Sequence, residues 1–483
     1  MSTFGSFEIG RRAIHAQQKG AQVTGQNIAN ANTEGYSRQV VIMKALVPPA
    51  APGVVTPPGY GVAISDITRV KSEFYGDQLM KALTSQSYWD RMGQTLGGIE
   101  VIFQEPGETG INISLNEFFD AWQELSVNPE SFAARISLRE QANTLTSVVR
   151  DINNRLDELK FDVEKEVEAS LKQVNSLAKE ITELNKKIVY LQALGQKSNE
   201  MLDERDLRLQ ELSQLLDIRV LQKDNGSVEV LAGGRILLHD DRYFPLEMKV
   251  NNVTQADDTV IQEIQIFNKS GSMLSLEGGG IAGMVESYNR VFPQYQGKLN
   301  ELVYNLVIEV NKIHQEGFGL DGVNDRVFFQ IIDENDKGRA AFNFYVDDGI
   351  LKNLNHIAAA FEDGANPLDP DFEAPGPGNG INALQIARLR EALVMEDKNA
   401  TFHDFFRGMI VDLGVEGRET QRMSLSMRTV AERMREQQES VSGVSLDDEM
   451  LNLIQYQHAY NAASRYLSVL DQMLGVLIDE IGR

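Results

Sequence analysis

The chain has 483 residues, no cysteine, and 70 acidic against 46 basic side chains, which gives a formal net charge of −24. A chain of this length forms two to four domains, and the negative charge argues against a nucleic-acid coat. The absence of cysteine excludes disulfide bonds, thiol nucleophiles and cysteine metal clusters. No apolar run has the length of a membrane span, and residues 1–20 lack the features of a signal peptide. We therefore expect no nucleic-acid partner, no membrane insertion and no export by a cleavable signal.

Residues 4–30 are predicted to form a helix with an apolar stripe on one side. The stripe consists of Phe4, Phe7, Ile14, Ala21 and Ile28. A neighbouring line contains small residues that leave room for another helix to approach closely: Ile9, Ala13, Ala16, Gly20 and Val23. Gly20 and Gly25 each weaken a helix by about 1 kcal/mol relative to Ala, so we expect this helix to need a partner.

The helix ends in the sequence NIANANTEGYSRQ, residues 27–39. Asn30 and Asn32 tolerate left-handed backbone geometry, and Gly35 allows a turn with positive φ. We interpret the stretch as a helix end and a turn, after which an extended segment runs from Tyr36 to Ile42. Nothing in it has the chemistry of a catalytic site.

The next part of the chain alternates between loops and long helical patterns. Residues 46–62 are too rich in Pro and Gly to be helical. Helical periodicity resumes over 72–104 and, after the turn sequence EPGETG, continues to residue 131. Residues 131–194 carry one helical pattern that would be about 90 Å long if unbroken, which predicts a rod. A further helix is predicted at 202–217, and we interpret its alternating charges as a solvated face.

Residues 218–276 change from helical periodicity to strand-like alternation. A hairpin is predicted around Asp224-Asn225-Gly226, and the segment TVIQEIQIF alternates apolar and polar residues. We therefore predict a small β domain inserted between helices. The remaining predictions are, in chain order, a helix at 281–314, an extended segment at 327–347, a helix at 350–362, a loop at 364–380, and helices at 381–395, 399–412 and 415–440.

The last forty or so residues are predicted to form one long helix with a narrow apolar seam. Alternate steps of three and four residues give Leu446, Leu453, Tyr456, Tyr460, Ala463, Leu467, Leu470, Leu474, Leu477 and Ile481. Only Glu449 breaks this pattern. Such spacing is typical of a coiled coil, and a narrow seam needs a partner helix to cover it. An ordinary terminal helix on a globular core remains the alternative.

The charges of the two ends favour a pairing between them. The first 44 residues carry five basic and two acidic side chains, whereas the last 41 carry two basic and six acidic side chains. Opposite charges suit two terminal helices that lie together, although the effect is weak at an exposed surface.

Three segments suggest ligand sites, and each has a simpler interpretation. GGGIAG, residues 278–283, matches a dinucleotide fingerprint, but no series of parallel βαβ units accompanies it, so a turn before a helix is favoured. DENDKG, residues 333–338, fails as a calcium loop because Lys337 and Phe344 stand where oxygen ligands are needed. His239 and its two neighbouring aspartates lie at a strand end and are interpreted as solvated. We predict no catalytic, cofactor-binding or metal site.

Both ends of the chain resemble the axial proteins of the bacterial flagellum, the family of rod, hook and hook-associated proteins. At the N-terminus the resemblance rests on Asn27, Ile28, Ala29, Asn30, Asn32, Thr33, Gly35, Tyr36, Ser37, Arg38 and Gln39. GYSRQ and the terminal VSLDDEMLNLIQYQHAYNAASRYLSVLDQMLGVLI are similar to the hook-associated branch. Phe118, Phe119 and Trp122 before Asn128-Pro129, and the later HQEGFGLDG, resemble the same branch.

Together, the patterns and the resemblance predict a mainly α fold with a β insertion (α+β), elongated and multi-domain. The predicted parts are an N-terminal axial helix and motif at 1–45, a helical rod domain at 46–217, an inserted outward β domain at 218–276, a second part of the rod domain at 277–442 with a β/loop excursion at 320–380, and a C-terminal coiled-coil helix at 443–483.

The resemblance implies an extracellular structural subunit that joins the hook to the filament through its paired terminal helices. The implied partners are copies of itself in a ring or tube, the hook protein, the next hook-associated protein or the filament side, and an export chaperone on the C-terminal helix. The resemblance also implies export by the flagellar type III apparatus. Two alternatives stay open: a hook or distal-rod protein, and a coiled-coil surface adhesin whose β insertion binds a ligand.

Overall fold

The computed structural model describes residues 3–46, 59–103, 110–254, 260–362, 375–396 and 398–481. Most of the Pro- and Gly-rich arm, most of the EPGETG turn and much of the loop predicted at 364–380 lie outside these residues. The side chains of Phe4, Leu477 and Ile481 also lie outside the described part of the chain.

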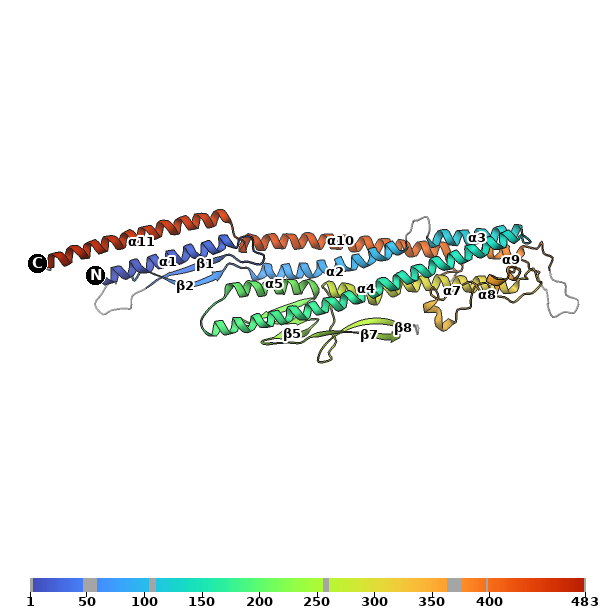
Figure 1. Ribbon diagram of the computed structural model, residues 1–483, viewed down its shortest axis with the longest axis horizontal. Coiled ribbons are helices and arrows are strands. Elements are labelled where there is room, and N and C mark those ends of the chain that lie inside the picture. The colour runs from blue at the N-terminus through green and yellow to red at the C-terminus, as the bar shows by residue number, and fades with distance from the viewer. Residues whose placement is uncertain are drawn as a thin grey trace. The chain divides into compact units, whose positions relative to one another are not determined.

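The described residues are mainly helical, with smaller β-sheets, which confirms the predicted fold class (Figure 1). The α-helices are α1 (Thr3–Ala29), α2 (Glu73–Phe103), α3 (Ile111–Val127), α4 (Phe132–Ala193), α5 (Asn199–Leu215), α6 (Gly280–Glu286), α7 (Phe292–Glu316), α8 (Asp348–Lys352), α9 (Ile381–Arg388), α10 (Phe402–Ser442) and α11 (Leu446–Ile481). The strands are β1 (Gln39–Ala45), β2 (Val62–Arg69), β3 (Ile218–Gln222), β4 (Val228–Ala232), β5 (Arg235–His239), β6 (Arg242–Tyr243), β7 (Leu246–Thr254) and β8 (Val260–Asn268).

The chain divides into two compact units, and each is built from separate stretches of sequence. The first unit contains Met1–Gln86, Val174–Pro245 and Ser426–Arg483, and the second contains Ser87–Gln173 and Leu246–Leu425. Helices α2, α4 and α10 contribute residues to both units. The strands predicted as one inserted domain at 218–276 form separate sheets, with β3–β6 in the first unit and β7–β8 in the second.

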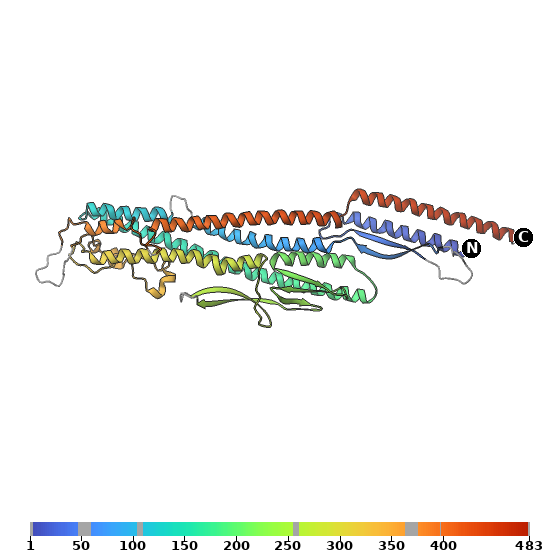
Figure 2. The same ribbon diagram turned by 180° about the vertical axis from the view of Figure 1, so that it is seen from behind.

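In the first unit, a hairpin and a small sheet accompany the terminal helices (Figures 1 and 2). Strands β1 and β2 pair antiparallel next to α1, and β2, which follows the Pro- and Gly-rich arm, is not among the predicted elements. Strands β3 to β6 form an antiparallel meander, and Asn185 of α4 donates a hydrogen bond to the Val228 carbonyl of β4 at 2.9 Å. Elsewhere in this unit α2 packs on α10 through a small apolar cluster of Leu79, Ala82, Leu83, Ala431 and Met434.

The second unit has an aromatic core. Trp122 of α3 packs against Phe328, with ring centroids 5.1 Å apart, and His314 of α7 contacts both rings, at 5.5 Å from Phe328 and 6.2 Å from Trp122. Aromatic side chains bury large apolar areas, so this cluster supplies much of the unit's hydrophobic stabilisation. The family-like residues Phe118 and Phe119 are buried in the same core.

The helix predicted at 281–314 is interrupted by a π-helical turn at Ser287–Val291. Asn289 in this turn donates to the Ile264 carbonyl at 3.0 Å and accepts from the Ile264 N–H at 2.8 Å. The amide therefore takes the place of a neighbouring strand along β8. A wider helical turn at this point allows one side chain to complete the sheet edge.

Three other predictions about local structure are wrong. The helices predicted at 399–412 and 415–440 are one helix, α10, because a single Gly414 costs only about 1 kcal/mol in a helix and does not end it. Residues 327–347 are not an extended strand, since Glu334–Arg339 forms a 3₁₀ helix and only the isolated bridge Phe329–Val346 is β-like. The helix predicted at 381–395 ends at Arg388.

The helix predicted at 350–362 also fails beyond α8, and side chains from other elements explain why. Arg135 of α4 donates to the carbonyls of Leu354 and Ile357 at 3.1 and 2.8 Å. His314 Nε2 accepts from the Ala358 N–H at 2.9 Å. These side chains satisfy backbone groups that a helix would otherwise pair, and local periodicity does not reveal them.

Candidate functional site

The two terminal helices lie side by side and antiparallel within the first unit (Figures 1 and 2). Gly10 faces Leu467, and Gly20 faces Tyr456. A Cβ atom at Gly20 would lie 2.5 Å from Tyr456 Cε1, and one at Gly10 would lie 2.5 Å from Leu467 Cδ2. The glycines therefore allow α11 to approach α1 closely, and each accommodates a large side chain of the partner helix.

The most buried side of α1 is offset from its predicted apolar stripe. The buried positions are Gly10, Ala16, Gly20, Val23, Thr24 and Asn27. Phe7, Ile14, Ala21 and Ile28 of the predicted stripe are half-buried. The line of small residues therefore makes the closer contact, as its small side chains allow.

The predicted seam of α11 is covered along most of its described length. Leu453, Tyr456, Ala463, Leu467, Leu470 and Leu474 are half-buried. Leu446 and Tyr460 are more exposed, at 49% and 40%. The seam therefore faces α1, and its less covered described positions are Leu446 at the start of the pattern and Tyr460 in its middle.

A second set of apolar side chains on α11 remains exposed. We call this set the outer apolar face: Met450, Leu451, Ile454, Tyr466, Val469, Met473 and Val476. Ile478 is also exposed, but it follows Leu474 by four residues and lies on the seam side of the helix. Exposed apolar residues in such number on one helix typically mark a surface that another molecule covers.

Glu449, the residue that breaks the apolar pattern, is the centre of a buried polar group. We call Asn27, Tyr36, Arg38, Gln39 and Glu449 the Glu449 cluster. Glu449 is 1% exposed and accepts hydrogen bonds from Arg38 Nε at 2.8 Å and from Asn27 Nδ2 at 3.0 Å. The cluster thus joins the end of α1 and the following motif to the first turn of α11.

Asn27 uses both ends of its amide in this cluster. Its Nδ2 also donates to the Gln39 carbonyl at 2.9 Å, and its Oδ1 accepts from the Gln39 N–H at 3.0 Å and the Tyr36 hydroxyl at 2.8 Å. Burial and the negative charges of Asp203, Glu200 and Glu449 raise the pKa of Tyr36 to about 12. The hydroxyl therefore stays protonated and available as a donor.

The motif that follows α1 docks on α5 through charged groups. The Ser37 N–H donates to Asp203 at 3.1 Å, and Arg69 at the end of β2 pairs with Asp203 and Asp206 at 2.8 Å. Lys71 also pairs with Asp206 at 2.5 Å. Burial opposes ionisation of Asp206, but the charges of Lys71 and Arg69 outweigh it and hold the pKa of this carboxyl below its usual value.

This docking corrects the interpretation of residues 202–217 as a solvated face. Asp203 and Arg205 are only 6% and 4% exposed. Arg205 donates to the Asn185 side chain and to the Gly226 carbonyl, so it connects α5 with α4 and the β3–β4 turn. The sequence pattern of alternating charges does not distinguish side chains that are solvated from side chains that pair with distant residues.

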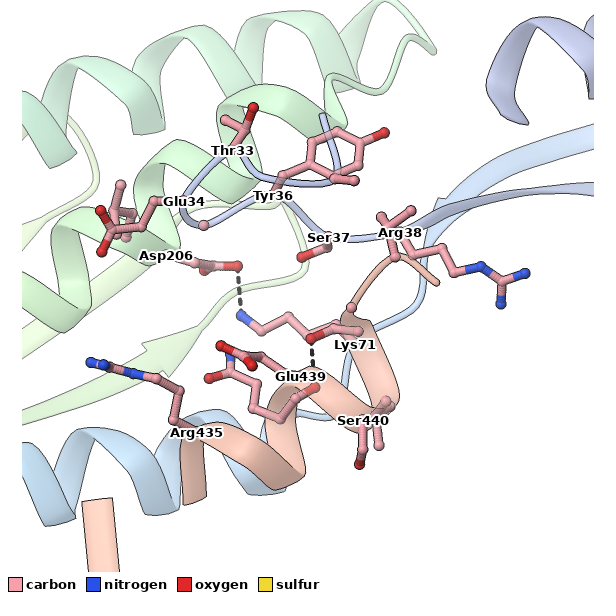
Figure 3. A pocket seen from close by; sticks show the side chains of 18 of the residues that line it. Thr33, Glu34, Tyr36, Ser37, Arg38, Lys71, Asp206, Arg435, Glu439 and Ser440 are labelled. Carbon is pink, nitrogen blue, oxygen red and sulfur yellow. Dashed lines mark hydrogen bonds and ion pairs between the residues drawn. The ribbon is translucent and has the colours of Figure 1, made fainter. Parts of the chain in front are cut away.

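A cavity of about 720 Å³ lies between the motif, α5 and the end of α10. Figure 3 shows Lys71 directed toward Asp206 between Ser37 and Glu439, with Arg435 on the same side as Glu439. The wall of the cavity carries charges of both signs. Among the described residues, no cluster of His, Asp or Glu could hold a metal ion, and no helix is long and apolar enough to cross a membrane.

The opposite charges of the two ends do not pair helix to helix. Within the described parts of α1 and α11, no ion pair joins the two helices, because Arg11 and Arg12 of α1 both pair with Glu8 of the same helix. The ion pair between the two ends comes from Arg38, which follows α1.

The other candidate sites form ordinary structural elements. GGGIAG makes a turn at Gly279, with φ 86°, followed by α6, as the turn-and-helix interpretation predicts. In DENDKG, Asp333 caps a short 3₁₀ helix by accepting from the Asn335 N–H. His239 is about half exposed and contacts Glu229 at 2.8 Å.

Family models match three parts of the chain. Residues 96–329 match the flagellar hook-associated protein FlgK helical domain. Residues 7–36 match the flagella basal body rod protein, and residues 437–480 match the flagellar basal body rod FlgEFG protein C-terminal. The two terminal matches include most of α1 and α11.

Full-length relatives point to the same group. The flagellar hook-associated protein 1 of Bacillus subtilis is 28% identical, and the alignment covers 100% of this chain and 99% of that protein. Its counterpart in Salmonella typhimurium is 23% identical over 96% of this chain and 98% of that protein. The solved flagellar hook junction protein FlgK from Burkholderia pseudomallei shares the fold, with a TM-score of 0.64 and 15% identity, over 76% of this chain and 100% of that chain.

Proposed function

Because the chain belongs to the flagellar hook-associated protein 1 family, we propose that it is a structural subunit of the bacterial flagellum that joins the hook to the filament. The match of residues 96–329 to the hook-associated helical domain favours this role over that of a hook or distal-rod protein. The end matches to rod proteins fit an axial assembly that uses both termini.

The observation that carries the proposal is the pairing of α1 with α11, which leaves the outer apolar face uncovered. We infer that α1 and α11 pair within each subunit and that neighbouring subunits in a ring or tube cover the outer face. The expected neighbours are copies of this chain, the hook protein on one side, and the next hook-associated protein or the filament on the other. Burial of apolar side chains then drives assembly.

The same surface gives a physical reason for protected export. An exposed apolar helix is an aggregation risk before assembly. The proposal therefore includes a cytoplasmic export chaperone on α11 and export through the flagellar type III apparatus to the extracellular junction, without a cleavable signal. No catalytic or cofactor-dependent step is part of it.

The test replaces three seam leucines by aspartate: Leu467→Asp, Leu470→Asp and Leu474→Asp in one protein. Each charge would lie in the contact between α11 and α1, where desolvation is costly. We expect loss of incorporation into flagella and of motility in a strain that lacks the natural protein. The amide exchange of the sheet formed by β3–β6 should be the same as in the unsubstituted protein, because none of the three leucines belongs to this sheet.

A matched control adds three charges at exposed positions of α10, away from both the seam and the outer apolar face: Gln421→Asp, Ser426→Asp and Gln437→Asp. The control should assemble and restore motility. Normal incorporation of the leucine variant would refute assembly through the seam, whereas equal failure of both variants would show that added charge alone blocks assembly. Co-purification of each variant with α11-binding proteins from the cytoplasm tests the chaperone separately.

A further inference from the structure

The apolar pattern of α1 and α11 does not by itself fix how the two helices align. The observed alignment places Gly10 against Leu467 and Gly20 against Tyr456. If α11 moved by one heptad, Gly10 would face Leu474 or Tyr460, which also belong to the apolar seam. Gly20 would then face Ala463 in the first of these cases. Sequences with a repeated apolar seam allow such slipped alignments unless a polar residue selects one of them.

Glu449 is the polar residue in the seam. Its partners at the other end of the chain, Asn27 and Arg38, are not repeated along α1 as the apolar positions are. In the observed alignment it lies beside Asn27, the last buried residue of α1, and accepts from Arg38 of the following motif. The shift that brings Gly10 to Leu474 would place Asn27 against Tyr456 and Glu449 beyond the end of α1. The opposite shift would place Glu449 against Gly20, which offers no side-chain donor, and Asn27 beyond the start of α11. Either shift would leave Glu449 without its bonds to Arg38 and Asn27, and Asn452 of the same helix, which donates to it at 3.5 Å, cannot replace both of these shorter bonds. A buried carboxylate that loses such donors is unfavourable.

Asn27 makes this selection depend on the motif. Three of its hydrogen bonds go to Gln39 and Tyr36, which hold the amide in the orientation that presents Nδ2 to Glu449. The Arg38 N–H also donates to the Ser442 carbonyl at 2.9 Å, which ties the motif to the end of α10. The two donors that Glu449 receives from the other end of the chain, Asn27 and Arg38, are therefore in place only when residues 27–39 have folded.

We propose that Glu449, through Asn27 and Arg38, fixes the alignment of α11 on α1 and permits that alignment only after the motif has folded. Glu449 is thus a positioning residue for the terminal helix pair. The inference rests on the geometry of one chain and stands apart from the proposed function. Its consequence for polymerisation alone rests on that function, since subunits with mixed alignments would present different outer faces.

The experiment uses engineered cysteine pairs, which the natural chain permits because it contains no cysteine. The alignment of Gly10 with Leu467 and of Gly20 with Tyr456 brings Ala13 opposite Ala463, so Ala13→Cys with Ala463→Cys reports the observed alignment without filling either glycine contact. Ala13→Cys with Leu470→Cys, and Ala13→Cys with Tyr456→Cys, report the two slipped alignments. Each full-length protein is oxidised mildly, and the yield of the internal disulfide is measured by mass spectrometry of its peptides. With Glu449 present, we expect efficient cross-linking of the first pair only.

Glu449→Leu restores the apolar pattern and removes the selecting group. We expect the yield of at least one slipped pair to rise about tenfold. Asp447→Leu is the matched control, because it replaces an exposed acid of the same turn by leucine, and it should leave the slipped yields unchanged. Glu449→Gln keeps an oxygen that accepts from Asn27 and should retain the observed alignment.

A role in stability alone predicts a different result. Glu449→Leu would then change the melting temperature while the slipped pairs stayed at their original yield, and this outcome would overturn the proposal. Slippage in Glu449→Gln as extensive as in Glu449→Leu would overturn it as well. Failure of the proposed function is distinguishable, since it would appear as absent flagellar incorporation in a protein whose cross-links report the observed alignment.

Discussion

Arg38 donates a hydrogen bond to the Glu449 carboxylate at 2.8 Å although 411 positions separate the two residues. The Glu449 side chain is 2% exposed and that of Arg38 is 30% exposed, so the pair lies at the edge of the buried contact between the two ends of the chain. The acid is also in the first turn of α11, where a negative charge is favourable. One carboxylate therefore stabilises the first turn of the C-terminal helix and also binds the N-terminal motif.

The first prediction concerns Gly20. A methyl group there would meet the Tyr456 ring at 2.5 Å, so Gly20→Ala should separate α1 from α11 locally in spite of the higher helix propensity of Ala. We expect a destabilisation of the pair of about 1–3 kcal/mol, measured by faster amide exchange along both helices.

Gly25→Ala is its matched control. No atom lies within 4 Å of a Cβ built at Gly25, so the substitution should stabilise α1 by up to about 1 kcal/mol. Slower exchange in both variants would contradict the close contact at Gly20.

The second prediction concerns Asp206. Lys71 and Arg69 lower its pKa in the folded protein despite its burial, so its contribution to stability is complete above the ordinary pKa of about 4 and is lost as the pH falls through the lowered pKa. Asp206→Asn should therefore destabilise the first unit by about 1–3 kcal/mol at pH 7 and weaken the pH dependence below pH 4.

Denaturant unfolding followed at several pH values checks this. Glu204→Gln, at an exposed position of the same helix, should leave both quantities unchanged. If Asp206→Asn and Glu204→Gln behaved alike, the contacts of Asp206 with Lys71 and Arg69 would contribute no net stability.

The long helices could be predicted because each of their turns repeats the same local signal. The 62 residues of α4 and the 36 of α11 carry apolar positions at helical spacing over many turns, and no single exception changes the pattern. The break at Glu449 was visible too, as a departure from the seam. Its partners could not be inferred, because Asn27 lies 422 positions away and an asparagine at a helix end is equally well explained by the turn.

Prediction failed where side chains take over the hydrogen bonds of the backbone. Residues 354–358 have a helical composition, but Arg135 and His314 satisfy their backbone groups from α4 and α7. The interpretation of residues 202–217 as a solvated face is wrong at Asp203 for a related reason, since its partners Arg69 and Ser37 belong to another part of the chain. In each case the deciding interaction joins residues that are far apart in the sequence. The local periodicity and helix propensity of the segment therefore do not indicate it.

The third prediction concerns His314, which is fully buried in the aromatic core of the second unit. Burial lowers its pKa from 6.5 to about 4, and Nε2 accepts from the Ala358 N–H, so the ring is neutral. In the unfolded chain this histidine becomes protonated below about pH 6.5, whereas in the folded chain it becomes protonated only below about pH 4. Stability should therefore fall by about 3 kcal/mol as the pH drops across this window.

His314→Gln removes this titration. The variant should be less stable at pH 7, because the ring leaves its contacts with Trp122 and Phe328, but its stability should depend less on pH between 6.5 and 4. His458→Gln, on the exposed side of α11, should keep the original dependence. An unchanged slope in His314→Gln would assign the acid sensitivity of this unit to other groups.

The fourth prediction concerns Gly283 of α6. A Cβ atom there would lie 2.4 Å from the backbone carbonyl oxygen of Tyr88, which has no rotamer into which it could move. Gly283→Ala should therefore force α6 away from α2 and destabilise the second unit by about 1–3 kcal/mol, measured as a lower denaturant midpoint. Gly297→Ala in α7 is the control, because nothing lies within 4 Å of its Cβ position, and the higher helix propensity of Ala should raise the midpoint. A raised midpoint in both variants would mean that GGGIAG is glycine-rich for a reason other than the contact with Tyr88.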